Sequence, residues 1–375
     1  MKIGILSLVL STNYGGILQA YALQTILERM GHEVIVLNKD RNMYLSAYRR
    51  YLSACKYFIF KHLLKKNVAY FNPQQVNEKR IEREKNTQQF IDRFIHTRVV
   101  KEIKKGILED VDCIIVGSDQ VWRPIYFNKL WGADIPDAFL RFVSNKKIRK
   151  YAYAASFGTD EWEYSASETT ICTNLIRDFN AVSVREVSAI SLCKEKLNRE
   201  DVSLVLDPTF LLNKEDYIEL VEKGQTPHSP GDMMCYILDE TKEKKTLVDH
   251  IAQEKGYTPF HTNSLADNPF APQEKRIQPP LEQWIRGFMD AKFIITDSYH
   301  ACIFSIIFKK PFIVLGNQER GLSRFYSLLD SMHLRQNLIV SPDEYNVNYP
   351  YTIPEDAYKT YLKLKEQSMA FLSKI

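Results

Sequence analysis

The chain has 375 residues, of which 45% are hydrophobic and 26% are charged. This length allows about two domains, and the composition excludes both a disordered polyelectrolyte and a small disulfide-stabilised protein. Its 50 basic and 46 acidic residues give a net charge of +4, which is too balanced for a surface that binds nucleic acid throughout. We therefore expect a globular protein without nucleic acid as a partner.

The cysteines and the N-terminal residues indicate in which cellular compartment the protein is located. Six cysteines are scattered without a C-x-x-C pair, which is typical of reduced thiols in the cytoplasm and predicts neither a disulfide framework nor a metal site. The apolar run 3–10 resembles a signal peptide, but the polar residues 11–16 interrupt it. No other stretch offers the roughly 18 apolar residues of a membrane span. We expect a cytoplasmic protein.

The first half of the chain alternates short apolar runs with helical patterns. Residues 3–10 and 33–37 read as buried strands that flank a helix over 17–30, which is a βαβ unit. Residues 40–108 do not follow this alternation of strands and helices. They contain aromatic and basic residues and then a charged helical pattern, which predicts an inserted helical subdomain. Further buried strands are predicted at residues 113–116, 151–154, 181–184 and 204–206. Together these patterns predict an N-terminal Rossmann-like domain over residues 1–210.

A second half repeats the pattern after a predicted linker. Residues 211–231 carry little apolar periodicity and form the predicted linker. Strands are predicted at residues 235–238, 293–295 and 312–315, with helices at 243–254, 281–291 and 299–308. We expect a second Rossmann-like domain over 232–354, which binds the donor, and a closing helix within 355–375. The fold class is thus α/β, with two domains facing a cleft and ligands at the carboxyl ends of the strands.

A polar, glycine-containing segment joins the first predicted strand to the first predicted helix. Gly15 and Gly16 would let a ligand approach the unpaired N–H groups of the helix start, beside Asn13 and Tyr14. Turn formation alone also explains a glycine pair. Both interpretations stay open.

Residues 117–122 follow another strand and contain an acid, an amide and an aromatic side chain. Asp119 is a candidate base or a group that orients a sugar hydroxyl, with Gln120 and Trp122 beside it. The alternative is a helix N-cap with Trp122 packed beneath it.

Basic residues occur at three further strand ends. His300 begins a helix, where a positive charge is unfavourable unless it contacts an anion; a neutral hydrogen-bonding role is the alternative. Arg185 could clamp a carboxylate or phosphate, or form a surface pair with Glu186. Arg320 and Arg324 are further anion contacts or simply solvated side chains.

Taken together, these segments resemble the polysaccharide pyruvyl transferase family. The matching pieces, in chain order, are residues 13–24, 117–122, 183–186, 207–209 and 296–300. The resemblance implies a two-domain fold similar to GT-B glycosyltransferases. It also implies transfer of a pyruvyl group from phosphoenolpyruvate to two sugar hydroxyls as a cyclic ketal, in surface polysaccharide biosynthesis. Phosphoenolpyruvate would be the donor, with no further cofactor, and the sugar acceptor would be free or lipid-linked.

The resemblance also implies roles for residues. It places Arg185 and His300 in donor binding, and many members carry Arg two residues before that His, where this chain has Ser298. Arg320 or Arg324 would then supply the missing charge.

The chemistry of ketal formation assigns the remaining roles. It needs a proton for the donor methylene, stabilisation of positive charge and loss of a hydroxyl proton. We expect His300 to be the general acid or the phosphate contact, Arg185 the anion clamp, and Asp119 or Asp297 a base or an acceptor-orienting group. The acceptor side of the cleft would be formed by Asn13, Tyr14, Gly15, Gly16, Gln120 and Trp122.

Two other functions stay open. A cleft of this kind could bind a nucleotide sugar and transfer a glycosyl group, and Ser298 leaves room for that reading. The chain could also be a non-catalytic member that binds a glycan or a partner protein.

One segment concentrates the positive charge. Residues 41–70 contain seven Lys and Arg, several aromatic residues and no Asp or Glu. They could rest on an anionic membrane, at the inner face, or form helices whose aromatic side chains pack on the sheet. Both hypotheses stay open.

Overall fold

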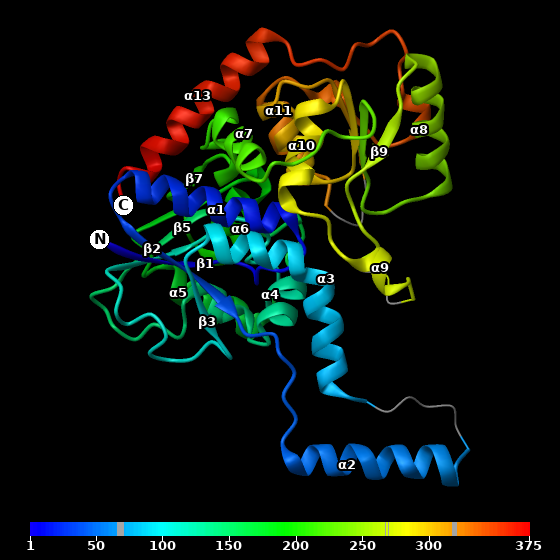
Figure 1. Ribbon diagram of the computed structural model, residues 1–375. Helices are drawn as coiled ribbons and strands as arrows, with labels where there is room; N and C mark the ends of the chain where they lie inside the picture. Colours follow the sequence, from blue (N-terminus) through cyan, green and yellow to red (C-terminus); the bar gives the residue numbers. More distant parts are fainter. Residues whose placement is uncertain (66–70, 267, 269, 317–320) are drawn as a thin grey trace.

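The protein folds around two parallel β-sheets. The computed structural model describes residues 1–65, 71–266, 268, 270–316 and 321–375 (Figure 1). Within this part, one sheet has seven strands in the order β3-β2-β1-β4-β5-β6-β7 and the other has five in the order β12-β11-β10-β8-β9. The predicted α/β class with two parallel sheets is therefore confirmed.

The seven-stranded sheet comes from the first half of the chain. Its strands are β1 (Lys2–Leu6), β2 (Glu33–Lys39), β3 (Thr97–Val100), β4 (Cys113–Val116), β5 (Arg149–Ala155), β6 (Ala181–Val184) and β7 (Val202–Leu204). The helices of this half are α1 (Tyr14–Arg29), α2 (Ala47–Phe58), α3 (Pro73–Phe94), α4 (Pro124–Trp131), α5 (Ala166–Ile176) and α6 (Val187–Leu197). A π-helix covers Ile59–Leu63, and 3-10 turns cover Ile135–Phe139 and Pro208–Phe210.

Helices cover both faces of this sheet, so its central strand β4 is apolar throughout. In β4, Ile115 packs in the cluster that contains α1, whereas Ile114 packs in the cluster that contains α5 and α6. Because successive side chains point to opposite faces, a strand buried on both faces reads as a continuous apolar run. This is why the sequence predicts β4 and β6 with their observed bounds.

The five-stranded sheet comes from the second half. Its strands are β8 (Met233–Tyr236), β9 (Pro259–His261), β10 (Phe293–Thr296), β11 (Phe312–Leu315) and β12 (Leu338–Ile339). The helices are α7 (Lys214–Lys223), α8 (Lys242–Lys255), α9 (Gln273–Arg276), α10 (Leu281–Asp290), α11 (Tyr299–Ile307), α12 (Ser323–Ser331) and α13 (Glu355–Leu372). Two 3-10 turns cover Arg335–Asn337 and Pro342–Glu344.

Two details of the predicted organisation are wrong. Residues 97–100, placed in the helical insertion, form the edge strand β3, in which Thr97 pairs with Val36 of β2. Residues 214–223, placed in a segment without apolar periodicity, form α7, whose Tyr217, Leu220 and Val221 are buried. An edge strand and a mostly charged helix each bury only a few side chains, so their apolar patterns are short. The domain boundaries themselves stay a prediction.

The two halves are packed together rather than merely joined. One continuous apolar cluster contains Ile5 of the first sheet and Ile294 of the second. The predicted closing helix α13 returns to the first half, where Ser368 Oγ accepts a hydrogen bond from the Leu206 N–H at 2.9 Å (Figure 1). Tyr361 of α13 donates its hydroxyl to the Phe210 carbonyl at 3.1 Å.

None of the helices in the described part of the chain is long and apolar enough to cross a membrane.

Candidate functional site

The predicted strand-end segments meet where the two halves face each other. The loop after β4, the residues after β6 and β7, the start of α11 and helix α12 all contribute side chains to one cluster. The cluster consists of Ser118, Asp119, Arg185, Asp207, Tyr299, His300 and Arg324. The carboxyl ends of parallel strands lie at one edge of a sheet, which is why these distant segments converge.

Arg185 lies at the centre of this cluster with its side chain fully buried. Its Nη1 donates to Asp207 Oδ2 at 2.6 Å and to Ser118 Oγ at 3.3 Å, and its Nη2 donates to Asp119 Oδ1 at 3.2 Å. The alternative of a surface pair with Glu186 is wrong, because both side chains are buried. A guanidinium this deep needs paired carboxylates, since an unpaired buried charge costs several kcal/mol.

Asp207 is the carboxylate that binds Arg185 most closely. Its Oδ2 also accepts from Ser118 Oγ at 2.9 Å, and its Oδ1 accepts from the Thr209 N–H at 3.0 Å. Burial by itself would raise the pKa of Asp207, but the neighbouring His300 and Arg185 hold the pKa well below its usual value. No functional role was predicted for Asp207. The signal was available, because an acid directly after an apolar strand faces the same sheet edge as the other candidates.

His300 is buried beside this carboxylate, in the first turn of α11. Its Nε2 lies 3.5 Å from Asp207 Oδ2. Within the described part of the chain, His300 Nε2 has no hydrogen-bond partner. A buried imidazole nitrogen that is left unpaired next to a carboxylate is placed to exchange a proton with a ligand.

The start of α1 presses against the ring of His300. Asn13 caps the helix, and its Oδ1 accepts from the Gly16 N–H at 3.2 Å. A Cβ atom on Gly15 would lie 2.1 Å from His300 Nδ1, and one on Gly16 would lie 3.5 Å from Asp119 Oδ2. Gly15 is therefore required for close approach, and the group that approaches in this structure is an imidazole from the other half of the protein.

Replacing Gly15 by Ala is expected to destabilise the protein by about 1–3 kcal/mol, because the added methyl overlaps the His300 ring. Urea unfolding of Gly15→Ala measures this cost. The double variant Gly15→Ala/His300→Ala removes the ring, so the cost of the added methyl should largely disappear in that background. An equal cost in both backgrounds would contradict the proposed contact.

Asp119 has an unusual backbone conformation, with φ of 71° in the left-handed region. It is buried, and its Oδ1 accepts from the Gln120 N–H at 2.9 Å. Burial by itself would raise the pKa of Asp119, but Arg185, His300 and Arg324 hold the pKa below its usual value. Such backbone strain concentrates at functional sites, where the fold holds a side chain in a required direction.

Tyr299 lies between two guanidinium groups. Arg185 Cζ is 4.7 Å and Arg324 Cζ is 5.2 Å from the centre of its ring. The alternative of a solvated Arg324 is wrong, because this side chain from α12 is buried in the cluster. Arg320 lies outside the described residues. The structure thus brings a second cation to the start of α11, close to the position where Ser298 replaces an Arg.

Tyr14 is not in the cluster. Its hydroxyl donates to the Pro279 carbonyl at 2.7 Å, and its ring contacts the rings of Tyr236 and Trp284. These partners belong to the second half of the chain. The structure therefore places Tyr14 in the packing between the two halves.

Gln120 and Trp122 make side-chain contacts with residues outside the cluster. Gln120 Oε1 accepts from Arg123 at 3.2 Å, and Trp122 is fully buried, with its ring stacked on Phe139 at 4.9 Å. The N-cap alternative for this segment is wrong, because α4 begins only at Pro124. The predicted packing of Trp122 beneath the segment agrees with its burial.

Asp297 and Ser298 support the local fold. The Asp297 oxygens accept from the backbone N–H groups of Leu238 and Asp239 at 2.7 Å and 3.0 Å and from Lys244 Nζ at 2.7 Å. Ser298 Oγ caps the first turn of α11. The structure does not bring Asp297 together with Asp119 and His300, and its oxygens already hold the loop after β8.

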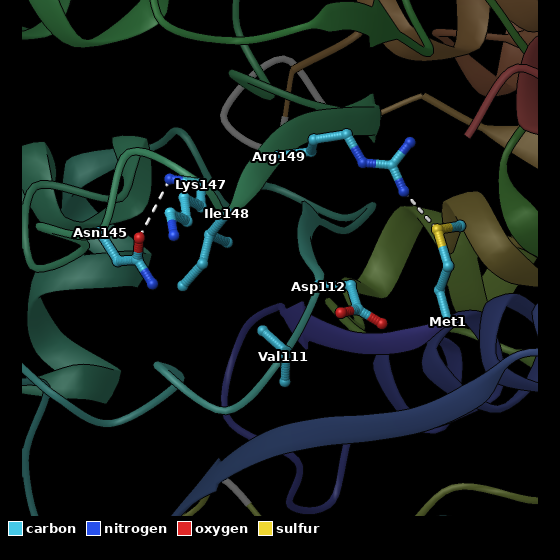
Figure 2. A pocket seen from close by; sticks show the side chains of 7 residues that line it. All are labelled: Met1, Val111, Asp112, Asn145, Lys147, Ile148 and Arg149. Carbon is cyan, nitrogen blue, oxygen red and sulfur yellow. Dashed lines mark hydrogen bonds between the residues drawn. The ribbon is translucent and has the colours of Figure 1, made fainter.

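One hollow lies at the opposite edge of the first sheet from the cluster, and a small cavity lies beside the cluster itself. The hollow has a volume of about 500 Å³ and lies at the amino ends of β1, β4 and β5. Figure 2 shows Met1, Asp112 and Arg149 among the side chains that line it. Ligands of parallel sheets bind at the opposite, carboxyl edge. Beside Arg185 and Tyr299 there is a cavity of about 30 Å³, which has room for about one water molecule.

Comparisons with known proteins place this chain in a family. The family model described as polysaccharide pyruvyl transferase matches residues 13–319. General stress protein 30 of Bacillus subtilis strain 168 is 29% identical over 145 residues, which are 36% of this chain and 38% of that protein. The match therefore spans less than half of that relative.

Two solved structures with a similar backbone course have names that mention a UDP-sugar. UDP-GlcNAc 2-epimerase from Methanocaldococcus jannaschii is 14% identical, with a TM-score of 0.49 over 100% of both chains. Arabidopsis thaliana UGT89C1 complexed with UDP-L-rhamnose is 10% identical, with a TM-score of 0.47 over 98% of this chain and 94% of that one. Because the family model covers most of the sequence, including Asp119, Arg185, Asp207 and His300, this chain belongs to the polysaccharide pyruvyl transferase family.

Proposed function

We propose that this chain transfers a pyruvyl group from phosphoenolpyruvate to two hydroxyls of a sugar, as a cyclic ketal, during surface polysaccharide biosynthesis. Family membership supports a polysaccharide-modifying transferase. The observation that carries the finer proposal is His300, whose buried Nε2 has no hydrogen-bond partner in the residues that the structure describes and lies in a cluster with two buried guanidinium groups. A proton donor beside fixed positive charge is what an anionic enol ester requires.

The proposed reaction moves two protons. The methylene carbon of the donor takes one proton, and the first sugar hydroxyl bonds to the neighbouring carbon, where positive charge develops. The bond from that carbon to the phosphate oxygen then breaks, and the second hydroxyl closes the ring. One hydroxyl proton replaces the proton that the methylene carbon consumed, and the other leaves on the phosphate, so atoms and charge balance.

The cluster suggests which residue serves each step. His300 gives the proton to the methylene carbon and recovers one from a hydroxyl, because its Nε2 is buried and has no hydrogen-bond partner among the described residues. Asp119 orients the acceptor rather than acting as the base, since its lowered pKa makes it a weak proton acceptor. Asp207 is a positioning residue, because it contacts His300 and Arg185 and keeps both in place.

Two guanidinium groups would hold the donor anion. Arg185 is the anion clamp of the proposal, and Arg324 supplies the charge that Ser298 lacks, because both flank Tyr299 at the start of α11. The 30 Å³ cavity beside Arg185 is too small for a three-carbon phosphate. We infer that donor entry moves the start of α11 away from the start of α1, where Gly15 and His300 are in contact.

Thermal stabilisation by ligands tests the donor. Phosphoenolpyruvate at about 100 times its Kd should stabilise the protein by about 2.7 kcal/mol, because it binds the folded state only. The stabilisation should disappear in Arg324→Gln and His300→Ala. It should persist in His96→Ala, a matched control in which an exposed histidine outside the cluster is removed.

The other outcomes decide between the competing functions. Stabilisation by a nucleotide sugar alone would replace the proposal with glycosyl transfer. No stabilisation by phosphoenolpyruvate or by any nucleotide sugar would favour a non-catalytic member. Stabilisation by inorganic phosphate to the same extent would show an anion site that does not recognise the donor.

A further inference from the structure

Helix α2 and the π-helix that continues it stand apart from both sheets. Figure 1 shows α2 at the end of a connection that leaves β2, on the far side of α3 from the rest of the protein. Tyr48, Tyr51 and Phe58 are 70%, 67% and 59% exposed. The hypothesis that aromatic side chains of this segment pack on the sheet is therefore wrong for these three residues.

The connection that carries α2 is attached to α3. Met43 donates its N–H to Asn77 Oδ1 at 2.8 Å, and Asn77 Nδ2 donates back to the Met43 carbonyl at 3.0 Å. Arg80 donates to Asn42 Oδ1 at 2.8 Å, and Arg41 forms an ion pair with the buried Glu84. Residues 41–43 are thus fixed to the body of the protein, and α2 begins a few residues beyond this anchor.

The exposed apolar side chains of this segment form one row. They recur at intervals of three and four residues, at positions Tyr48, Tyr51, Leu52, Cys55, Phe58 and Ile59. Side chains at this spacing share one face of a helix. Leu52 and Ile59 are 46% and 44% exposed, so the row is open along its length.

Positive charge accompanies this row, and negative charge is missing. Residues 41–70 contain seven Lys and Arg but no Asp or Glu, and one of the seven, Arg41, is used by its ion pair. Lys56 Nζ lies 5.8 Å from the ring centre of Phe60, and Lys61 Nζ lies 5.1 Å from that of Tyr57. Lys56 and Lys61 are exposed.

We propose that the helix over residues 47–63 docks this protein on an anionic lipid bilayer, with the apolar row in the headgroup region. An amphipathic helix with aromatic residues on one face and Lys and Arg beside them binds such surfaces. Charge complementarity favours lipid over a second copy of the chain. Two copies would bring the same uncompensated cations together, and like charges across an interface are repelled.

Flotation with vesicles tests this docking. The protein should float with vesicles that contain phosphatidylglycerol at low salt, bind phosphatidylcholine vesicles far more weakly, and be released at high salt. Tyr51→Ser/Phe58→Ser and Lys56→Glu/Lys61→Glu should each weaken binding by a factor on the order of 10–100. Thermal melting should stay unchanged, since these side chains are exposed.

Matched controls separate the docking face from general properties of the surface. Val347→Ser/Leu362→Ser removes two apolar side chains that are 53% and 42% exposed elsewhere, and should bind like the original protein. Lys104→Glu/Lys105→Glu makes the same change in net charge on another exposed segment, and should also bind normally.

Cys55 offers a second readout. It lies in the apolar row and is partly exposed, whereas the other five cysteines are buried, so a thiol-reactive environment-sensitive dye should label it selectively. Its emission should shift to the blue with phosphatidylglycerol vesicles. Absence of flotation at low salt, or undiminished flotation of both α2 variants, would overturn the proposal. Concentration-dependent dimerisation that only the α2 variants lose, without flotation, would replace it with a homodimer interface.

Discussion

Replacing His300 by Ala is expected to lower kcat for pyruvyl transfer by a factor on the order of 10²–10⁴, the usual contribution of a general acid. The reason is that His300 Nε2 is buried beside Asp207 and the two guanidinium groups, with no hydrogen-bond partner in the described part of the chain. Release of inorganic phosphate from phosphoenolpyruvate, in the presence of a sugar acceptor that supports turnover, measures this loss.

Two variants test whether the loss of activity comes from the missing proton transfer rather than from weaker binding of the donor. His300→Gln keeps a hydrogen-bond donor but cannot exchange a proton at neutral pH, so it should bind phosphoenolpyruvate while remaining as inactive as His300→Ala. His96→Ala should keep full activity, because His96 is exposed and its ring pairs with Glu28, outside the cluster. Normal turnover of His300→Ala would exclude His300 as the proton donor.

Replacing Asp207 by Asn is expected to destabilise the protein by about 3–5 kcal/mol, the usual cost of removing one partner from a buried ion pair. Arg185 donates to Asp207 at 2.6 Å, and both side chains are fully buried. Urea unfolding followed by tryptophan fluorescence at neutral pH measures the difference. Asp201→Asn is a suitable control, because Asp201 is 75% exposed and its pair with Arg199 should contribute at most about 1 kcal/mol.

The same carboxylate predicts the pH dependence of stability. The pKa of Asp207 is lower in the folded protein than the value of about 3.9 expected for an unfolded chain. The unfolded state therefore binds the proton first, so the contribution of Asp207 is complete above that unfolded pKa and is lost as the pH falls through the folded pKa. Between about pH 5 and pH 3, the original protein should lose more stability than Asp207→Asn. Parallel curves for the two proteins would contradict this assignment.

Burial explains which elements the sequence could predict. The strands β4, β6 and β11 were predicted with their observed bounds, because a parallel strand covered on both faces is almost entirely apolar, and Ser183 of β6 is the one polar residue in these three strands. The closing helix α13 was predicted over 355–372 from its amphipathic pattern. The edge strand β3 was missed, since none of its residues is fully buried.

Part of the candidate site could be predicted from the sequence, and the rest depends on the tertiary structure. The sequence by itself determined that Asp119, Arg185 and His300 follow or begin elements at a ligand-binding edge, because strand ends and helix starts can be read from local patterns. It also determined the family, since the order of the short motifs along the chain is specific.

Only the tertiary structure decided which of these side chains meet. Asp207 pairs with Arg185, and Gly15 meets the ring of His300, because packing of the two sheets brings together segments far apart in the chain. Packing also turned Tyr14 into a contact between the halves and left the apolar row of α2 uncovered. These outcomes depend on distances between elements, and no local pattern of residues contains that information.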